Sequence, residues 1–159
     1  MNKVTNIVVA GLGGQGVLKA SDVIAEAALL AGFDVKKSEI HGMSQRGGSV
    51  TSDVRFGPRV LSPMVPEGEA DFLVLLEPEE LETNRHLLAP GGRLVHPDMA
   101  AGVRLASRRS LNVALLGVLS RWLDFPEQAW TSAIRACFKP ELQEPNLAAF
   151  RAGRAAVIK

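Results

Sequence analysis

The sequence predicts an α/β fold, namely a three-layer α/β/α Rossmann-like domain with a mostly parallel sheet and a helical C-terminal third. Short apolar runs at 7–10 and 72–76 have the length and content of buried strands. The first run leads directly into a glycine loop and a stretch with helical spacing, and proline-separated helical segments fill the chain after residue 110. The length of 159 residues suits one domain over 1–159.

The N-terminal half predicts a strand, a helix and two further strands. Residues 7–10 form the first strand, and 17–31 carry apolar residues at helical spacing up to Gly32, which ends the helix. Residues 33–39 read as a second strand, parallel to the first. After a loop, 49–56 alternate between apolar and polar residues, which indicates a strand with one solvated or partner-facing side.

The second half predicts a central strand, a helix, a further strand and then helices only. Residues 72–76 are apolar at every position, and Glu77-Pro78 opens a helix that Pro90-Gly91-Gly92 closes before a strand at 93–96. The final helices are expected at 111–123, 126–138 and 140–154. The first of these is apolar on nearly every side, so we expect it to be buried or, with a slight preference, to lie in an interface.

Charge and cysteine content exclude several classes of protein. Eighteen basic and seventeen acidic residues give a net charge of +1, which argues against a nucleic-acid partner. The single cysteine, Cys137, excludes an internal disulfide or a self-contained iron–sulfur cluster, and we expect a buried structural thiol. His86 and His96 lack further ligands at metal spacing. The sequence contains neither a signal peptide nor an apolar stretch of membrane length, so we expect a cytoplasmic protein with no membrane partner.

The first candidate site is a glycine loop that fits G-x-G-x-x-G between a strand and a helix. Such a loop brings backbone N–H groups close to a phosphate. Lys36 and Lys37 stand where a dinucleotide site would have an acidic residue, and Glu39 comes late. The alternative is that the glycines only solve a cramped connection. The candidate cofactor-binding residues are Gly11, Gly13, Gly14, Gln15 and Gly16.

The second candidate site follows the second strand and should lie at the same carboxyl edge of the sheet, so that two loops face one crevice. Arg46 could bind a carboxylate or phosphate with two parallel hydrogen bonds, and His41 could shuttle a proton near neutral pH. The alternative is that these side chains only bind neighbouring backbone and a partner subunit. Further candidate cofactor-binding residues in this loop are Gly42, Gln45, Gly47 and Gly48.

Both loops together resemble a known family. The runs 11–18, 38–50 and 54–57 resemble the gamma-type domain of pyruvate and 2-ketoisovalerate ferredoxin oxidoreductases. The wording H-G-M-x-Q-R-G-G-S-V at 41–50 is most similar to the beta subunit of indolepyruvate ferredoxin oxidoreductase. The likeness extends to Glu-Ala-Asp-Phe-Leu-Val at 69–74 and Ser-Leu-Asn at 110–112, and so covers nearly the whole chain.

The resemblance implies a subunit that is inactive alone. The complex would decarboxylate a 2-oxoacid on thiamine diphosphate with magnesium, reduce ferredoxin through iron–sulfur clusters and release an acyl-CoA. These groups would belong to a larger partner subunit, and this chain alone would bind none of them. The chain would assemble as a homodimer or as part of a hetero-oligomer. The resemblance gives Arg46 and His41 a supporting role toward an anionic substrate or CoA. The chain is short for the family, so a C-terminal element that holds the partner is expected to be absent.

Two other interpretations stay open. The chain could be an autonomous nucleotide-binding module, with NADP as the first ligand to test because Lys36 and Lys37 would suit a 2′-phosphate. It could also be a scaffold subunit whose loops contact only protein.

Overall fold

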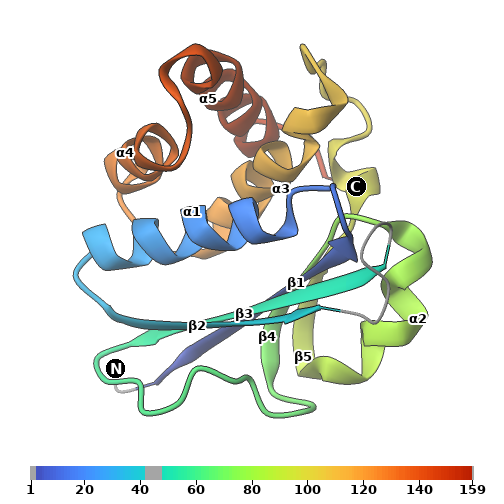
Figure 1. Ribbon diagram of the computed structural model, residues 1–159, viewed down its shortest axis with the longest axis vertical. Helices are drawn as coiled ribbons and strands as arrows, with labels where there is room; N and C mark the ends of the chain where they lie inside the picture. Colours follow the sequence, from blue (N-terminus) through green and yellow to red (C-terminus); the bar gives the residue numbers. More distant parts are fainter. Residues whose placement is uncertain (1–2, 42–47, 159) are drawn as a thin grey trace.

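The computed structural model describes residues 3–41 and 48–158 and has an α/β architecture, as predicted. Its mixed sheet has the strand order β2-β3-β1-β4-β5 (Figure 1). β3 is antiparallel to both of its neighbours, and the other four strands run in one direction. The strands are β1 (Thr5–Leu12), β2 (Asp34–His41), β3 (Ser49–Gly57), β4 (Ala70–Leu75) and β5 (Leu88–Val95).

The position of β3 corrects the predicted strand–helix–strand unit. β1 and β2 share a direction, but they are not neighbours, because β3 lies between them and pairs with both along its length. The apolar face of β3, including Val50, Val54 and Phe56, is buried. Its other face was expected to be solvated or to meet a partner, yet Asp53 there is buried and accepts the Val65 N–H at 2.9 Å. The loop after β3 therefore covers part of this face.

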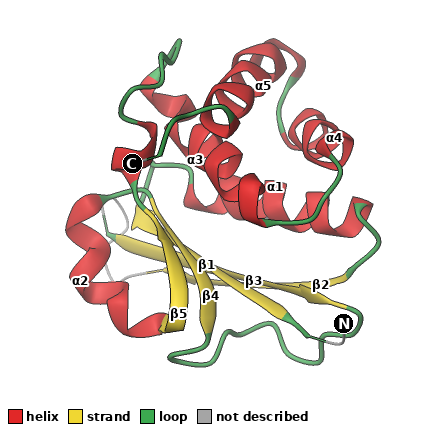
Figure 2. Ribbon diagram, turned by 180° about the vertical axis from the view of Figure 1, so that it is seen from behind, coloured by secondary structure: helices red, strands yellow, loops and turns green. Residues whose placement is uncertain are grey.

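The helices form two unequal layers (Figures 1 and 2). Those on the thicker side are α1 (Val17–Leu30), α3 (Leu111–Leu119), α4 (Glu127–Cys137) and α5 (Pro140–Arg154). On the opposite face, the helical elements among the described residues are α2 (Leu81–Asn84) and the two 3-10 turns that flank it, η1 (Pro78–Glu80) and η2 (Arg85–Leu87). The sequence thus predicted the helical C-terminal third correctly, but the single helix expected after Glu77 is broken into three short turns.

The edge strand β5 also differs from the expectation. Pro90-Gly91-Gly92 lies inside β5 instead of ending a helix before it. The register with β4 shifts there, and Gly91 has a φ of +79°. Proline and a positive φ are tolerated at a bulge in an edge strand, because the unpaired side needs no N–H donor.

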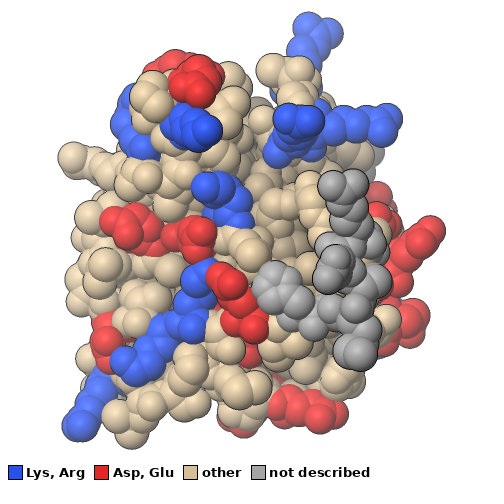
Figure 3. Space-filling model, in the orientation of Figure 1, with Lys and Arg blue, Asp and Glu red and all other residues tan. Residues whose placement is uncertain are grey.

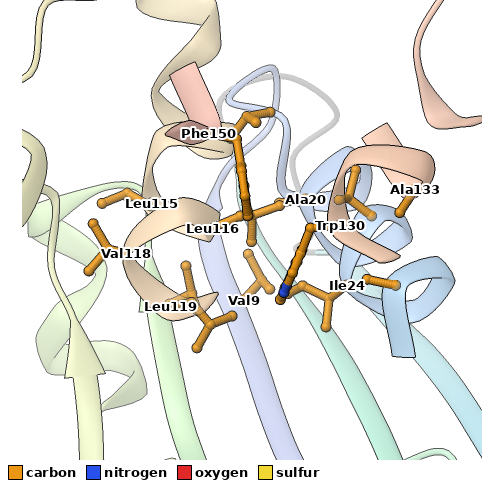
Figure 4. Packing of buried hydrophobic residues seen from close by; sticks show 14 of the residues in the cluster. Val9, Ala20, Ile24, Leu115, Leu116, Val118, Leu119, Trp130, Ala133 and Phe150 are labelled. Carbon is orange, nitrogen blue, oxygen red and sulfur yellow. The ribbon is translucent and has the colours of Figure 1, made fainter. Parts of the chain in front are cut away.

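The main core lies between the sheet and the four larger helices (Figure 4). Trp130 and Phe150 are fully buried, and they end an aromatic series in which contacting rings have centroids 5.1 to 5.8 Å apart. The series comprises Phe33, Phe56, Phe125, Trp130 and Phe150. A smaller cluster that includes Val8, Ala10, Leu73 and Leu75 fills the other face of the sheet.

Helix α3 is buried within the chain itself, contrary to the slight preference for an interface. Eight of its nine residues are buried. Helix α5 covers it closely, since a Cβ on Gly117 would overlap the backbone of Phe150 and a Cβ on Gly153 would overlap the Ala114 carbonyl. Two glycines therefore allow the helix backbones to touch.

Helix α1 ends as the sequence predicted. Gly32 has a φ of +96°, its N–H donates to the Leu29 carbonyl, and the Phe33 N–H donates to the Ala28 carbonyl. This is the Schellman arrangement that lets the chain turn into β2. In the described part of the chain, every helix is too short or too polar to cross a lipid bilayer.

Candidate functional site at the glycine loops

The two predicted loops meet at one edge of the sheet. β1 and β2 both end there, and the Gly13 N–H donates to the Gly48 carbonyl at 2.9 Å. Of the second loop, Gly42, Gln45, Arg46 and Gly47 lie outside the described residues. His41 is the last residue of β2, and its backbone pairs with that of Val50. The structure thus brings the first loop and the described ends of the second loop to one edge of the sheet, whereas Arg46 lies outside the described residues.

Gln15 closes the first glycine loop on itself. Its Oε1 accepts the Leu12 N–H at 2.7 Å, and its Nε2 donates to Glu77 Oε1 at 3.0 Å. A Cβ on Gly11 would come within 2.8 Å of Gln15 Oε1 and 3.0 Å of the Leu76 side chain. The side-chain amide of Gln15 therefore links the end of β1 to the segment that follows β4.

Gly16 is held by a residue that sequence analysis did not single out as functional. It precedes α1 with a φ of +84°, and its carbonyl accepts Asn112 Nδ2–H at 3.2 Å. Asn112 Oδ1 in turn accepts the Val113 N–H at 2.9 Å. The one sequence signal for this contact was Ser-Leu-Asn at 110–112, which the family resemblance shared. Gly14 also has a positive φ, +90°, but a Cβ there would meet open space.

The surroundings of the loop do not suit a dinucleotide. In such sites the second parallel strand lies beside the first and carries the group that binds the ribose. Here β3 separates β2 from β1, and Lys37 Nζ lies 2.6 Å from both Asp22 and Glu39. Burial alone would lower the pKa of Lys37, but the hydrogen bonds that it donates to Asp22 and Glu39 raise its pKa above the usual value. Lys37 is thus a paired cation and not a free phosphate ligand.

The remaining candidates do not form a site. Cys137 is half-buried and not fully buried as expected, and burial, with Asp22 and Glu26, raises the pKa of its thiol. It lines a cavity of about 420 Å³ beside α1. His86 is exposed, and His96 Nδ1 accepts the Asp98 N–H at 3.1 Å. The residues that the structure describes contain no group of three potential metal ligands.

The sequence and the fold of this chain both match known proteins. A family model described as pyruvate ferredoxin/flavodoxin oxidoreductase matches residues 6–100. The indolepyruvate oxidoreductase subunit IorB of Thermococcus kodakarensis is 34% identical over 188 aligned residues, which cover 93% of this chain and 93% of that protein. The match therefore extends over almost all of both sequences.

Solved structures share the fold. The pyruvate oxidoreductase subunit PORC of Thermotoga maritima aligns with a TM-score of 0.67 and 26% identity, and 98% of each chain is covered. The 2-oxoglutarate:ferredoxin oxidoreductase of Magnetococcus marinus, solved with 2-oxoglutarate, coenzyme A and succinyl-CoA, gives a TM-score of 0.79 and 24% identity. That match covers 98% of this chain but only 31% of the Magnetococcus chain.

The chain is shorter than this relative, as the family resemblance implied. Since 93% of 159 residues is about 148, roughly 40 of the 188 aligned positions in the Thermococcus relative have no counterpart in this chain. These positions lie inside the matched stretch. The difference from this relative is thus largely internal.

Proposed function

Because the chain belongs to the pyruvate ferredoxin/flavodoxin oxidoreductase family, we propose that it is the small, cluster-free subunit of a 2-oxoacid:ferredoxin oxidoreductase that acts on indolepyruvate or a related 2-oxoacid. The observation that carries the proposal is the 34% identity to an indolepyruvate oxidoreductase subunit across 93% of both chains. By itself the chain is inactive, and the complex performs thiamine-dependent oxidative decarboxylation to an acyl-CoA with reduction of ferredoxin.

The cofactors are assigned to a larger partner subunit. An iron–sulfur cluster needs about four thiolates, and this sequence has one cysteine. Thiamine diphosphate is assigned there as well, because the sequence has no G-D-G followed by a downstream Asn-Asn pair to hold a magnesium diphosphate. CoA enters the proposal because the Magnetococcus enzyme, which shares the fold, was solved with it. We place the whole complex in the cytoplasm.

The glycine loops supply a preorganised edge for this partner. Gln15, Glu77 and Asn112 hold the first loop through side-chain hydrogen bonds, so it can be buried against protein without rearrangement. We propose that Gly13, Gly14 and Gly48 line this contact. His41 and Arg46 are the proposed side chains that act on an anionic substrate or CoA at the same edge. Gly42, Gln45 and Gly47 belong to the same proposed surface.

The test is anaerobic affinity purification of the tagged chain from its native host. A stoichiometric larger subunit, brown iron–sulfur absorbance and thiamine-dependent 2-oxoacid oxidation are expected. A colourless protein without a partner would refute the proposal, and saturable NADP binding by that isolated protein would support an autonomous nucleotide-binding module instead.

The role of Arg46 is tested in the same reconstituted complex. Arg46→Ala should raise the KM for CoA or the 2-oxoacid, or impair assembly, because a bidentate contact to an anion is lost. Arg46→Lys keeps the charge and should recover only part of the activity. Full assembly with unchanged kinetics in Arg46→Ala would remove Arg46 from the site.

A further inference from the structure

One stretch of the chain is basic without any acidic residue. Between Asp98 and Asp124 the sequence has four arginines and no aspartate or glutamate, although the whole chain carries eighteen basic and seventeen acidic residues. Three of these arginines lie within six positions, on a segment that we call the arginine segment (101–110). Figure 3 shows basic side chains gathered at the upper right, over the segment that Figure 1 draws in yellow and orange. The positive charge is therefore concentrated locally.

The three arginines of this segment, Arg104, Arg108 and Arg109, are exposed. Within the part of the chain that the structure describes, none of them has an ion-pair partner or a side-chain hydrogen bond. Arg121, the fourth arginine, instead donates to the Ala156 carbonyl. Arg121 is thus used within the fold, whereas the charges of the arginine segment are available to another molecule.

The backbone that carries these arginines is anchored. Val103 and Leu105 pack against the main core on either side of Arg104. Ser107 Oγ accepts the Arg109 N–H at 3.2 Å, and Ser110 is buried. The guanidinium groups are therefore presented outward from a fixed segment, which lowers the conformational entropy lost when they bind a partner.

The arginine segment lies next to the glycine loops. It leads directly into α3, and Asn112 in the first turn of α3 donates to the Gly16 carbonyl. The family match ends at residue 100, so the segment lies outside the matched region. A partner that covers the glycine-loop edge would thus meet these arginines at the border of the contact.

We propose that Arg104, Arg108 and Arg109 dock against an acidic surface of the larger subunit, an inference that rests on the proposed function. Small anions are usually bound in concave sites, whereas these side chains stand on an exposed segment. Arginine forks pair well with carboxylates, and a charged rim mainly accelerates association and fixes orientation. The arginine segment therefore steers the small subunit onto its partner.

The test measures the association rate constant of the full-length chain with the purified larger subunit. The variant combines Arg104→Gln, Arg108→Gln and Arg109→Gln, and a matched control combines Arg59→Gln, Arg85→Gln and Lys139→Gln, which are exposed elsewhere. Both variants lower the net charge by three. Unchanged melting temperatures would verify that both fold.

At about 0.1 M salt, where the Debye length is about 10 Å, the arginine variant should associate about tenfold more slowly than the wild type. The difference should shrink at about 1 M salt, where the Debye length is about 3 Å. The control should stay near the wild-type rate. Equal rates for wild type and arginine variant, or equal slowing in both variants, would overturn the docking surface while the proposed function stands. Failure of the wild-type chain to bind any thiamine-dependent subunit would overturn both.

Discussion

Replacing Gly16 by alanine tests whether the first glycine loop is shaped mainly by packing. The residue has a φ of +84°, and an added Cβ would overlap the Asn112 side chain, which donates to the Gly16 carbonyl. Two costs therefore act together in Gly16→Ala. One is the left-handed backbone, and the other is displacement of a buried amide that is only 4% exposed.

The magnitude follows from these two costs. A left-handed conformation costs a non-glycine residue about 1–2 kcal/mol. Displacing Asn112 loses a hydrogen bond and leaves a buried donor unpaired, which costs about 1–3 kcal/mol. We expect Gly16→Ala to lower the free energy of unfolding by about 3 kcal/mol. With an m-value of about 2 kcal/mol/M, the urea midpoint falls by roughly 1.5 M.

Gly14→Ala is the matched control, since Gly14 also has a positive φ but an added Cβ would meet open space. It should cost only the backbone term, about 1–2 kcal/mol. The assay is urea unfolding followed by circular dichroism, extended to Asn112→Ala and the double variant. In the double-mutant cycle, Asn112→Ala should remove about half of the Gly16→Ala cost. Equal costs for Gly14→Ala and Gly16→Ala, or additive costs in the cycle, would refute the reasoning.

Three further predictions concern stability. Gly153→Ala should destabilise the chain by about 3 kcal/mol in urea unfolding because its Cβ would overlap the α3 backbone, whereas Gly102→Ala, with open space around it, should change stability by less than about 0.5 kcal/mol; similar values for both would contradict the close α3–α5 contact. Burial raises the pKa of Asp53 above 3.8, so the folded chain binds the Asp53 proton more tightly than the unfolded chain does, and stability should fall as pH rises from 3.8 through the folded-state pKa. Asp53→Asn should flatten the plot of urea midpoint against pH in that range. An unchanged slope would contradict the raised pKa of Asp53. The raised pKa of Lys37 means that its ion pairs stabilise the fold below pH 10.5 and that this contribution is lost as the pH rises above that value. Because the pairs are partly exposed, Lys37→Met should lower the free energy of unfolding by about 0.5 kcal/mol at neutral pH. A loss of stability that persists unchanged at high pH would contradict an ionic origin.

The order of helices and strands could be predicted from local patterns, but their arrangement could not. Periodicity and glycine placement located α1, and proline separated α3, α4 and α5, because these signals act within a few residues. The neighbours of β3 depend on pairings with β1 between residues that lie 37 to 51 positions apart in the sequence. Side chains alternate in the same way in a strand that is paired along both edges and in a strand that is paired along one edge, so the alternation does not reveal which strands lie beside β3.

The candidate site divides in the same way. The glycine loop was visible as a motif, and Gly16 has the positive φ that such loops need. Its hydrogen-bond partners were not visible, since Glu77 lies 62 residues from Gln15 and Asn112 lies 96 residues from Gly16. Only packing of the chain decides which polar group meets which carbonyl.

The sequence by itself determined the α/β class, the helical C-terminal third and the family, because hydrophobic periodicity and the wording of two loops are local properties. The tertiary structure decided that β3 separates β1 from β2, and this removed the strand pair that a dinucleotide site requires. It also decided that Lys37 is bound to two carboxylates while Arg104, Arg108 and Arg109 have no such partner among the described residues. Charge pairing depends on distances of a few ångströms between segments far apart in the chain, and only the folded packing fixes those distances.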